Sequence, residues 1–282
     1  MVAMTAQTMA DEIRRQLNLS RSITALQATV STGKKLTLPS QDPQAWVQVS
    51  EIGRAQAQQS AWQANVDFGI SRAQKAEANL NEMNTLYSRA RELMISASTG
   101  TLDAAGKAAI ATDLQTIRVT LADFLEEKDY QGIPVFDDTV TIAIPISRGI
   151  SLEAVGTRQS IADGVDLGAA GISTLDAILG QAITAIQSGT DADRAAALTA
   201  VEKGLDHVVL NQSVQGIRSD RLSKAKESLT DVDLNLAERR SKLEDTDLTA
   251  AISTIQAQLL TLEAAQAAFA RINQKSLFDL IG

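Results

Sequence analysis

The only histidine of the sequence, His207, is one candidate for acid–base or metal chemistry. It lies in the segment Gly204-Leu-Asp-His-Val-Val-Leu210, on a predicted helix, with no serine or cysteine nucleophile motif beside it. The chain has no cysteine, and a zinc site needs three or four nitrogen or sulfur ligands. We interpret His207 as a packed or solvated helix residue and expect no catalytic role for it.

Closely spaced carboxylates are a second group that could bind a metal or transfer protons. They occur at Glu126/Glu127, Asp137/Asp138, Asp191/Asp193, Asp231/Asp233 and Asp245/Asp247. None of these pairs fits a calcium loop with its central glycine and terminal glutamate. Acidic residues are typical of helix N-termini and of solvated helix faces. We therefore predict no metal and no catalytic site.

Two further segments resemble ligand-binding motifs only superficially. The stretch Gly164-Val-Asp-Leu-Gly-Ala-Ala-Gly171 lacks the spacing of a dinucleotide fingerprint and the Lys-Ser/Thr of a P-loop. It is interpreted as a flexible connection, and no cofactor is expected. Lys34 and Lys35 are too few for nucleic-acid binding, which leaves a solvated turn or a contact with an acidic neighbouring subunit.

Composition excludes several classes of partner. The chain has 282 residues, of which 3% are aromatic, and a formal net charge of -8. Such an acidic chain has no electrostatic reason to bind nucleic acid or anionic lipid. No apolar run approaches the ~20 residues that span a membrane, so no membrane insertion is expected. Met1 to Arg15 lacks the pattern of a cleaved signal peptide.

Proline-free stretches predict long helices at both ends of the chain. A first helix is predicted over about 5–31, and Gly33 and the prolines that follow it break this helix. A second is predicted from Asp42 as N-cap and Pro43 as first helical residue to about Ser98. A third is predicted over about 103–128, with an apolar stripe formed by Ile110, Leu114, Ile117, Leu121, Phe124 and Leu125.

The middle of the sequence changes character. β-branched residues from Thr139 to Ile146 favour a small β-hairpin region at 132–168, with Pro145 at an edge. Helix is predicted again over 172–188 and 190–274, with Thr190 or Asp191 as N-cap of the second. Leucines recur every seven residues at Leu222, Leu229, Leu236 and Leu243, and the spacing changes near Asp245, which indicates a change of packing partner.

Narrow apolar stripes at the two chain ends fit either an ordinary intramolecular core or an assembly seam, and their position at the extreme ends of the chain favours the seam. Residues spaced alternately three and four apart lie on one face of a helix. The seam residues are Leu19, Ile23, Leu26 and Val30 in the first helix, and Leu248, Ile252, Ile255, Leu259, Leu262 and Phe269 in the last. Because an isolated helix pair is only marginally stable, we expect the ends to become fully ordered on assembly.

Three segments resemble a known family. The first is the linker Ser31 to Pro43, with Gly33, Lys34, Pro39, Asp42 and Pro43 as its motif residues. The second is Arg89-Ala-Arg-Glu-Leu93, and the third combines Asp245–Ala251 with the ending Leu277-Phe-Asp-Leu-Ile281. Over about 5–130 and 205–282 the chain resembles the bacterial flagellin superfamily, and within it the hook–filament junction family of third hook-associated proteins.

The resemblance implies a mainly α fold: a long helical rod, a terminal-helix coiled coil and a small β-hairpin region in the middle. It implies that 1–42 and 245–282 form the two halves of an inner coiled-coil domain. It implies an outer helical rod over 43–244, with the β-hairpin region at about 132–168. The family's large variable outer domains would have little room in this chain.

The resemblance also implies a function. It implies a non-enzymatic structural subunit, exported through the flagellar apparatus without a cleaved signal peptide and located outside the cell at the hook–filament junction. The implied partners are like subunits, the first hook-associated protein, filament flagellin and an export chaperone. A filament flagellin and a flagellin-like cell-surface binding protein remain alternatives, although the low aromatic content disfavours a sugar-stacking site.

Overall fold

The computed structural model describes residues 6–99, 102–129, 132–138 and 140–278, with side chains except at 6, 8 and 272–278. The chain forms two compact units, of which one comprises Met1–Ala57 with Asp233–Gly282 and the other comprises Gln58–Val232. The helices α2 (Pro43–Ser98) and α6 (Asp191–Glu244) contribute residues to both units. The domain limits at 42/43 and 244/245 stay a prediction.

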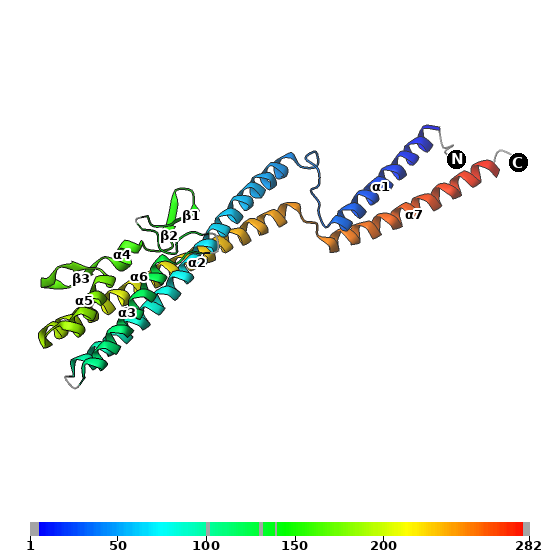
Figure 1. Ribbon diagram of the computed structural model, residues 1–282. Coiled ribbons are helices and arrows are strands. Elements are labelled where there is room, and N and C mark those ends of the chain that lie inside the picture. The colour runs from blue at the N-terminus through cyan, green and yellow to red at the C-terminus, as the bar shows by residue number, and fades with distance from the viewer. Residues whose placement is uncertain (1–5, 100–101, 130–131, 139, 279–282) are drawn as a thin grey trace. The chain divides into compact units, whose positions relative to one another are not determined.

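Helices from both chain ends build the first unit. The helix α1 (Ala6–Thr32) packs beside α7 (Leu248–Phe278), as Figure 1 shows. The start of α2 is capped as predicted, because Asp42 Oδ1 accepts a hydrogen bond from Ala45 N at 2.9 Å. The predicted continuous helix over 190–274 is wrong at 245–247, where the chain leaves the helix and Asp247 caps α7 through Ala250 N at 3.0 Å.

Hydrogen bonds from side chains hold α2 and α6 antiparallel in the second unit. Gln59 Nε2 donates to Leu229 O at 2.8 Å near one end of the pair, and Arg91 Nε donates to Glu202 Oε1 at 3.0 Å near the other. Thr190 caps α6, because its Oγ1 accepts from Asp193 N at 3.2 Å while Asp193 Oδ2 accepts from Thr190 N at 2.8 Å. This reciprocal capping decides between the two predicted N-caps.

The core of the second unit lies between α2, α6 and two shorter helices. The helix α3 (Ala104–Glu126) packs against α5 (Leu175–Ser188). The stripe predicted for α3 is confirmed, with Phe124 half-buried and the other five members buried. In the seven-residue leucine repeat of α6, Leu222 and Leu229 are buried and the two later leucines are half-buried.

The predicted β-hairpin is confirmed as β1 (Ala143–Ser147) paired antiparallel with β2 (Ile150–Glu153). The pairing register shifts between Pro145 and Ser147. The short helix α4 (Arg158–Ala162) and a second strand pair, β3 (Val165–Asp166) with β4 (Ile172–Ser173), follow, with η1 (Gly168–Ala170) between the two strands. This pair extends past residue 168, and α5 therefore begins at Leu175 rather than at 172.

Gly69 allows the hairpin to pack closely against α2. A Cβ at this position would lie 2.9 Å from Ile144 Cγ1, closer than side-chain contacts normally come. Asn65 Nδ2, one turn earlier, donates a hydrogen bond to Pro145 O at 3.2 Å. Gly69 therefore has a packing role, since the buried side chain of Ile144 lies against it.

A substitution at Gly204 tests the packing of the second unit. A Cβ at this position would lie 2.5 Å from Cε1 of Tyr87, whose buried hydroxyl donates to Leu175 O at 2.5 Å. We expect Gly204→Ala to lower the free energy of unfolding by about 1–2 kcal/mol, because the added methyl forces the ring to move.

Gly216→Ala is the matched control on the same helix. Its Cβ would meet only Glu77 Oε1, at 3.9 Å, so the variant should gain about 0.5–1 kcal/mol from its better helix propensity. Urea unfolding of both variants measures the difference. Equal destabilisation by the two substitutions would contradict the packing assignment.

Candidate functional site

The predicted seam residues of α1 lie against α7. Ile23 is buried at 5% exposure, and Leu19, Leu26 and Val30 are half-buried. Their spacing of four, three and four residues keeps them on one face over three turns of helix. The structure therefore brings this part of the predicted seam together within one chain.

The predicted seam residues of α7 divide between two faces. Ile255, Leu262 and Phe269 are half-buried, whereas Leu248, Ile252 and Leu259 are 46%, 45% and 39% exposed. The covered face also contains Ala251, Gln258 and Ala265, which the sequence reasoning missed. Because these three residues are small or polar, the covered face has only a weak apolar pattern in the sequence. The larger exposed residues beside it give a stronger pattern and were therefore taken as part of the seam.

Apolar side chains remain uncovered along both helices. In α1, Met9, Ile13 and Leu17 are 38%, 45% and 52% exposed. In α7, Leu260 is 69% exposed, and the three exposed seam residues lie on the same helix. A group of exposed apolar side chains of this kind indicates an interaction surface. The helix pair buries one side of each helix and leaves enough apolar surface for further helices.

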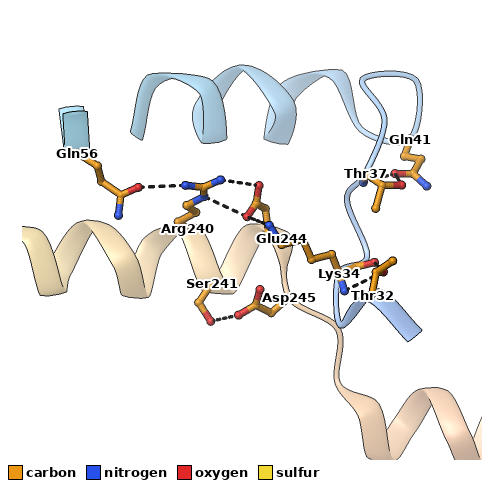
Figure 2. A network of polar contacts seen from close by, with 9 residues as sticks. All are labelled: Thr32, Lys34, Thr37, Gln41, Gln56, Arg240, Ser241, Glu244 and Asp245. Atoms are coloured by element: carbon orange, nitrogen blue, oxygen red, sulfur yellow. Dashed lines mark hydrogen bonds and ion pairs between the residues drawn. The ribbon is translucent and has the colours of Figure 1, made fainter. Parts of the chain in front are cut away.

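Polar contacts join the linker after α1 to the end of α6, as Figure 2 shows. Lys34 Nζ lies 3.1 Å from Glu244 Oε2, and Arg240 Nε lies 3.0 Å from the same oxygen. Arg240 Nη1 also donates to Gln56 Oε1 of α2 at 3.3 Å. Glu244 is buried at 7% exposure, so its carboxylate is held by two cations. We call these four residues the linker clamp.

Backbone hydrogen bonds reinforce the linker clamp. Lys35 N donates to Glu244 O at 2.7 Å, and Thr246 N donates to Gly33 O at 2.9 Å. Gly33 has a φ of 71°, a conformation that favours glycine. Lys35 Nζ donates to Lys242 O at 2.8 Å. Both lysines therefore contact their own chain, which accounts for them without an acidic neighbour.

The rest of the linker is an ordered turn. Gln41 Oε1 accepts hydrogen bonds from Thr37 N at 2.7 Å and Leu38 N at 3.0 Å. Pro39 lies in the exposed turn that follows, before the cap of α2. Leu36 is buried at 4% exposure and is a further linker residue that the sequence reasoning missed. Both polar and apolar contacts therefore stabilise the conformation of the linker.

The electrostatics of Glu244 make the linker clamp sensitive to acid. Burial raises the pKa of this carboxyl, but hydrogen bonds and charges from Arg240 and Lys34 outweigh burial, and the pKa lies below its usual value. A lowered folded-state pKa means that the stabilisation is present above the unfolded pKa of about 4.5 and is lost as the pH falls through the folded pKa.

The lowered pKa of Glu244 in the folded protein leads to a prediction for the pH dependence of Glu244→Gln. We expect the parent to be more stable than the variant at neutral pH, and the difference to shrink as the pH falls below about 4.5. Trp46 fluorescence in a Trp62→Phe background measures unfolding of the first unit, since only Trp46 belongs to that unit. A difference that stays constant down to pH 3 would contradict the ion-pair assignment.

Structural contacts account for several of the other candidate groups. His207 Nε2 lies 3.1 Å from Ile161 O, which fits a packed helix histidine. Asp193 Oδ2 accepts from Thr190 N in the reciprocal cap of α6, Asp247 caps α7, and Asp138 pairs with Arg158 at 2.6 Å. No group of three or more His, Cys, Asp or Glu able to hold a metal occurs among the described residues. Within the same part of the chain, no helix is long and apolar enough to cross a membrane.

The fold and the paired chain ends define an α-helical structural protein. Family models of the bacterial flagellin N-terminal and C-terminal helical regions match residues 3–141 and 198–281. The chain therefore belongs to the bacterial flagellin family, a family of structural proteins of the flagellum. Residues 279–281 of the C-terminal motif, and the side chains of 277 and 278, lie outside the described residues.

Individual relatives agree with the family. Flagellar hook-associated protein 3 of Escherichia coli K12 is 28% identical over 287 residues, which cover 89% of this chain and 90% of that protein. Flagellin of Halalkalibacterium halodurans is 25% identical over 260 residues, which cover 92% and 90%. The solved hook-associated protein-3 of Legionella pneumophila has the same fold, with a TM-score of 0.62 at 12% identity over 69% of this chain and 98% of that one.

Proposed function

We propose that this protein joins the hook to the filament of the bacterial flagellum. The observation that carries the proposal is the match to hook-associated protein 3 of Escherichia coli over nearly the whole of both chains. The half-covered helix pair at the chain ends supports it, because such a surface needs further copies to bury it. The assembly seam of Leu19, Ile23, Leu26 and Val30 with its α7 partners is part of this proposal.

The mechanism is geometric rather than catalytic. The terminal segments, 1–42 and 245–282, form the inner domain that packs with like subunits, and 43–244 forms the outer rod. A junction subunit must contact hook-type packing on one side and filament-type packing on the other. Its partners are therefore the first hook-associated protein and filament flagellin. Export through the flagellar apparatus, with a chaperone and without a cleaved signal peptide, completes the proposal.

Seeded assembly tests the function directly. Purified protein is added to isolated hooks with and without the first hook-associated protein, and to filament seeds, and the products are viewed by electron microscopy. A short collar at the hook tip that depends on the first hook-associated protein is the expected result. Long fibres growing from the seeds would instead assign a filament role.

A filament flagellin is the second candidate. The match to the flagellin of Halalkalibacterium halodurans over 92% of this chain favours it. A cell-surface binding protein has weaker support, because Trp46 and Trp62, the two candidate sugar platforms, are both half-buried in α2. A compact monomer that enters neither hooks nor filaments in the same experiment would favour the binding protein.

A further inference from the structure

Two exposed apolar patches lie on the terminal helices. The α1 patch consists of Met9, Ile13 and Leu17, and the α7 patch consists of Leu248, Ile252 and Leu259. Every side chain of both patches is exposed, so another molecule can reach it. The residues step by four in α1 and by four and seven in α7, which keeps each patch on one side of its helix.

Both patches lie beside the face that the helix pair covers, not on it. Ile252 directly follows the buried Ala251, and Leu17 directly follows the half-buried Gln16. One residue corresponds to a rotation of about 100° around the helix. A helix of another molecule can therefore cover either patch without displacing the helix that already packs there.

The two patches lie at different levels of the helix pair. The facing helix ends are joined by the hydrogen bond from Thr246 N to Gly33 O at 2.9 Å. Ile13 is twenty residues from Gly33, whereas Ile252 is six residues from Thr246. The difference of fourteen residues corresponds to about 20 Å along the helix axis. The patches of one chain therefore do not meet each other, and an occupant must come from outside the helix pair.

A second copy displaced along the axis matches the two patches. We propose that the α1 patch of one copy packs against the α7 patch of a neighbouring copy displaced by about 20 Å along the helix axis. The same displacement brings Leu17 level with Leu248 and Ile13 level with Ile252, because both helices step by four residues there. This inference rests on the proposed function, and it names the surfaces by which the subunits meet.

Charge complementarity favours a second copy as the occupant. From Leu17 to Thr32 the chain has one charged residue, Arg21, whereas 245–270 has three acidic residues and no basic one. Arg21 is one turn beyond Leu17, Asp247 is next to Leu248, and both charged side chains are exposed. The displacement that pairs the two leucines therefore brings opposite charges to the same end of the contact.

The contact is heterologous, because each copy uses its α1 patch for one neighbour and its α7 patch for another. Such contacts do not end at a dimer, since they continue from copy to copy and form a ring or a helical array. Two unlike patches at different levels therefore suit a subunit that assembles in many copies.

Disulfide cross-linking tests the contact, because the parent chain has no cysteine. An Ile13→Cys protein and an Ile252→Cys protein are mixed, assembled on hooks, oxidised and run on a non-reducing gel. We expect a cross-linked dimer of the two proteins from the assembled fraction and none from the unassembled fraction. Incorporation without a cross-link would overturn the proposal, since residues that pack across two helices lie within disulfide distance.

Gln27→Cys mixed with Ile252→Cys is the matched control. Gln27 is exposed on α1 and is six residues from Gly33, so it is level with Ile252 when two copies meet without displacement. This pair should incorporate and not cross-link, and a yield equal to that of the first pair would overturn the proposed displacement. Electron microscopy shows separately whether the copies enter hook collars or filaments, so failure of the junction role is distinct from failure of the contact.

Charge reversal tests the contact without cysteine. Arg21→Glu and Asp247→Lys should each lower incorporation about fivefold, because each places like charges at the end of the contact. The double variant, Arg21→Glu with Asp247→Lys, should incorporate better than Asp247→Lys alone. Loss of the α7 cap is the same in both of these variants, so the recovery reports the ion pair between copies. Additive losses, or no loss in the single variants, would contradict the proposed contact.

Discussion

Ile255→Asp is expected to lower incorporation into hook or filament assemblies by at least about 100-fold. Ile255 is half-buried in a single chain, and the proposed assembly would cover it further. An unpaired carboxylate in that position must either lose its hydration or become protonated, and both are unfavourable. The second unit, whose core contains no part of α7, should stay folded.

Ser253→Asp is the control for this variant, because Ser253 is exposed on the same helix. Sedimentation of hook-bound protein measures incorporation, and Trp62 fluorescence in a Trp46→Phe background reports the second unit. Normal incorporation of Ile255→Asp would show that the predicted seam is not the assembly surface. Loss of the Trp62 signal would show instead that the substitution unfolds the second unit.

Periodicity predicted the helices on which the proposed assembly seam lies. The stripe from Leu19 to Val30 and the capped start of α2 at Asp42 follow from local spacing and turn chemistry, which depend on neighbouring residues alone. The covered face of α7 was harder to predict. Ala251 and Gln258 lie on it, while Leu248 and Ile252 are exposed. Hydrophobic size indicates an apolar stripe, but a single sequence does not distinguish the face covered within a chain from the face left for other copies.

The linker clamp could not be predicted from spacing. Lys34 and Glu244 are separated by 210 positions, and no local pattern relates them. Leu36 was missed for the same reason, because its burial depends on the chain folding back beside the end of α6. The break at 245–247 follows from this arrangement. Glu244 O accepts from linker backbone amides, and Asp247 starts a new helix.

Glu244→Ala is expected to lower the free energy of unfolding of the first unit by about 2 kcal/mol. The substitution leaves the guanidinium of Arg240 and the ammonium of Lys34 without their shared carboxylate. Breaking a fully buried ion pair costs more, about 3–5 kcal/mol, but both cations are partly exposed and can be hydrated. Trp46 fluorescence during urea unfolding measures the change.

Glu238→Ala is the matched control, because Glu238 is exposed on the same helix and belongs to the same unit. It should change stability by less than about 0.5 kcal/mol. Equal destabilisation by Glu244→Ala and Glu238→Ala would contradict the assignment of Glu244 as the shared carboxylate of the linker clamp.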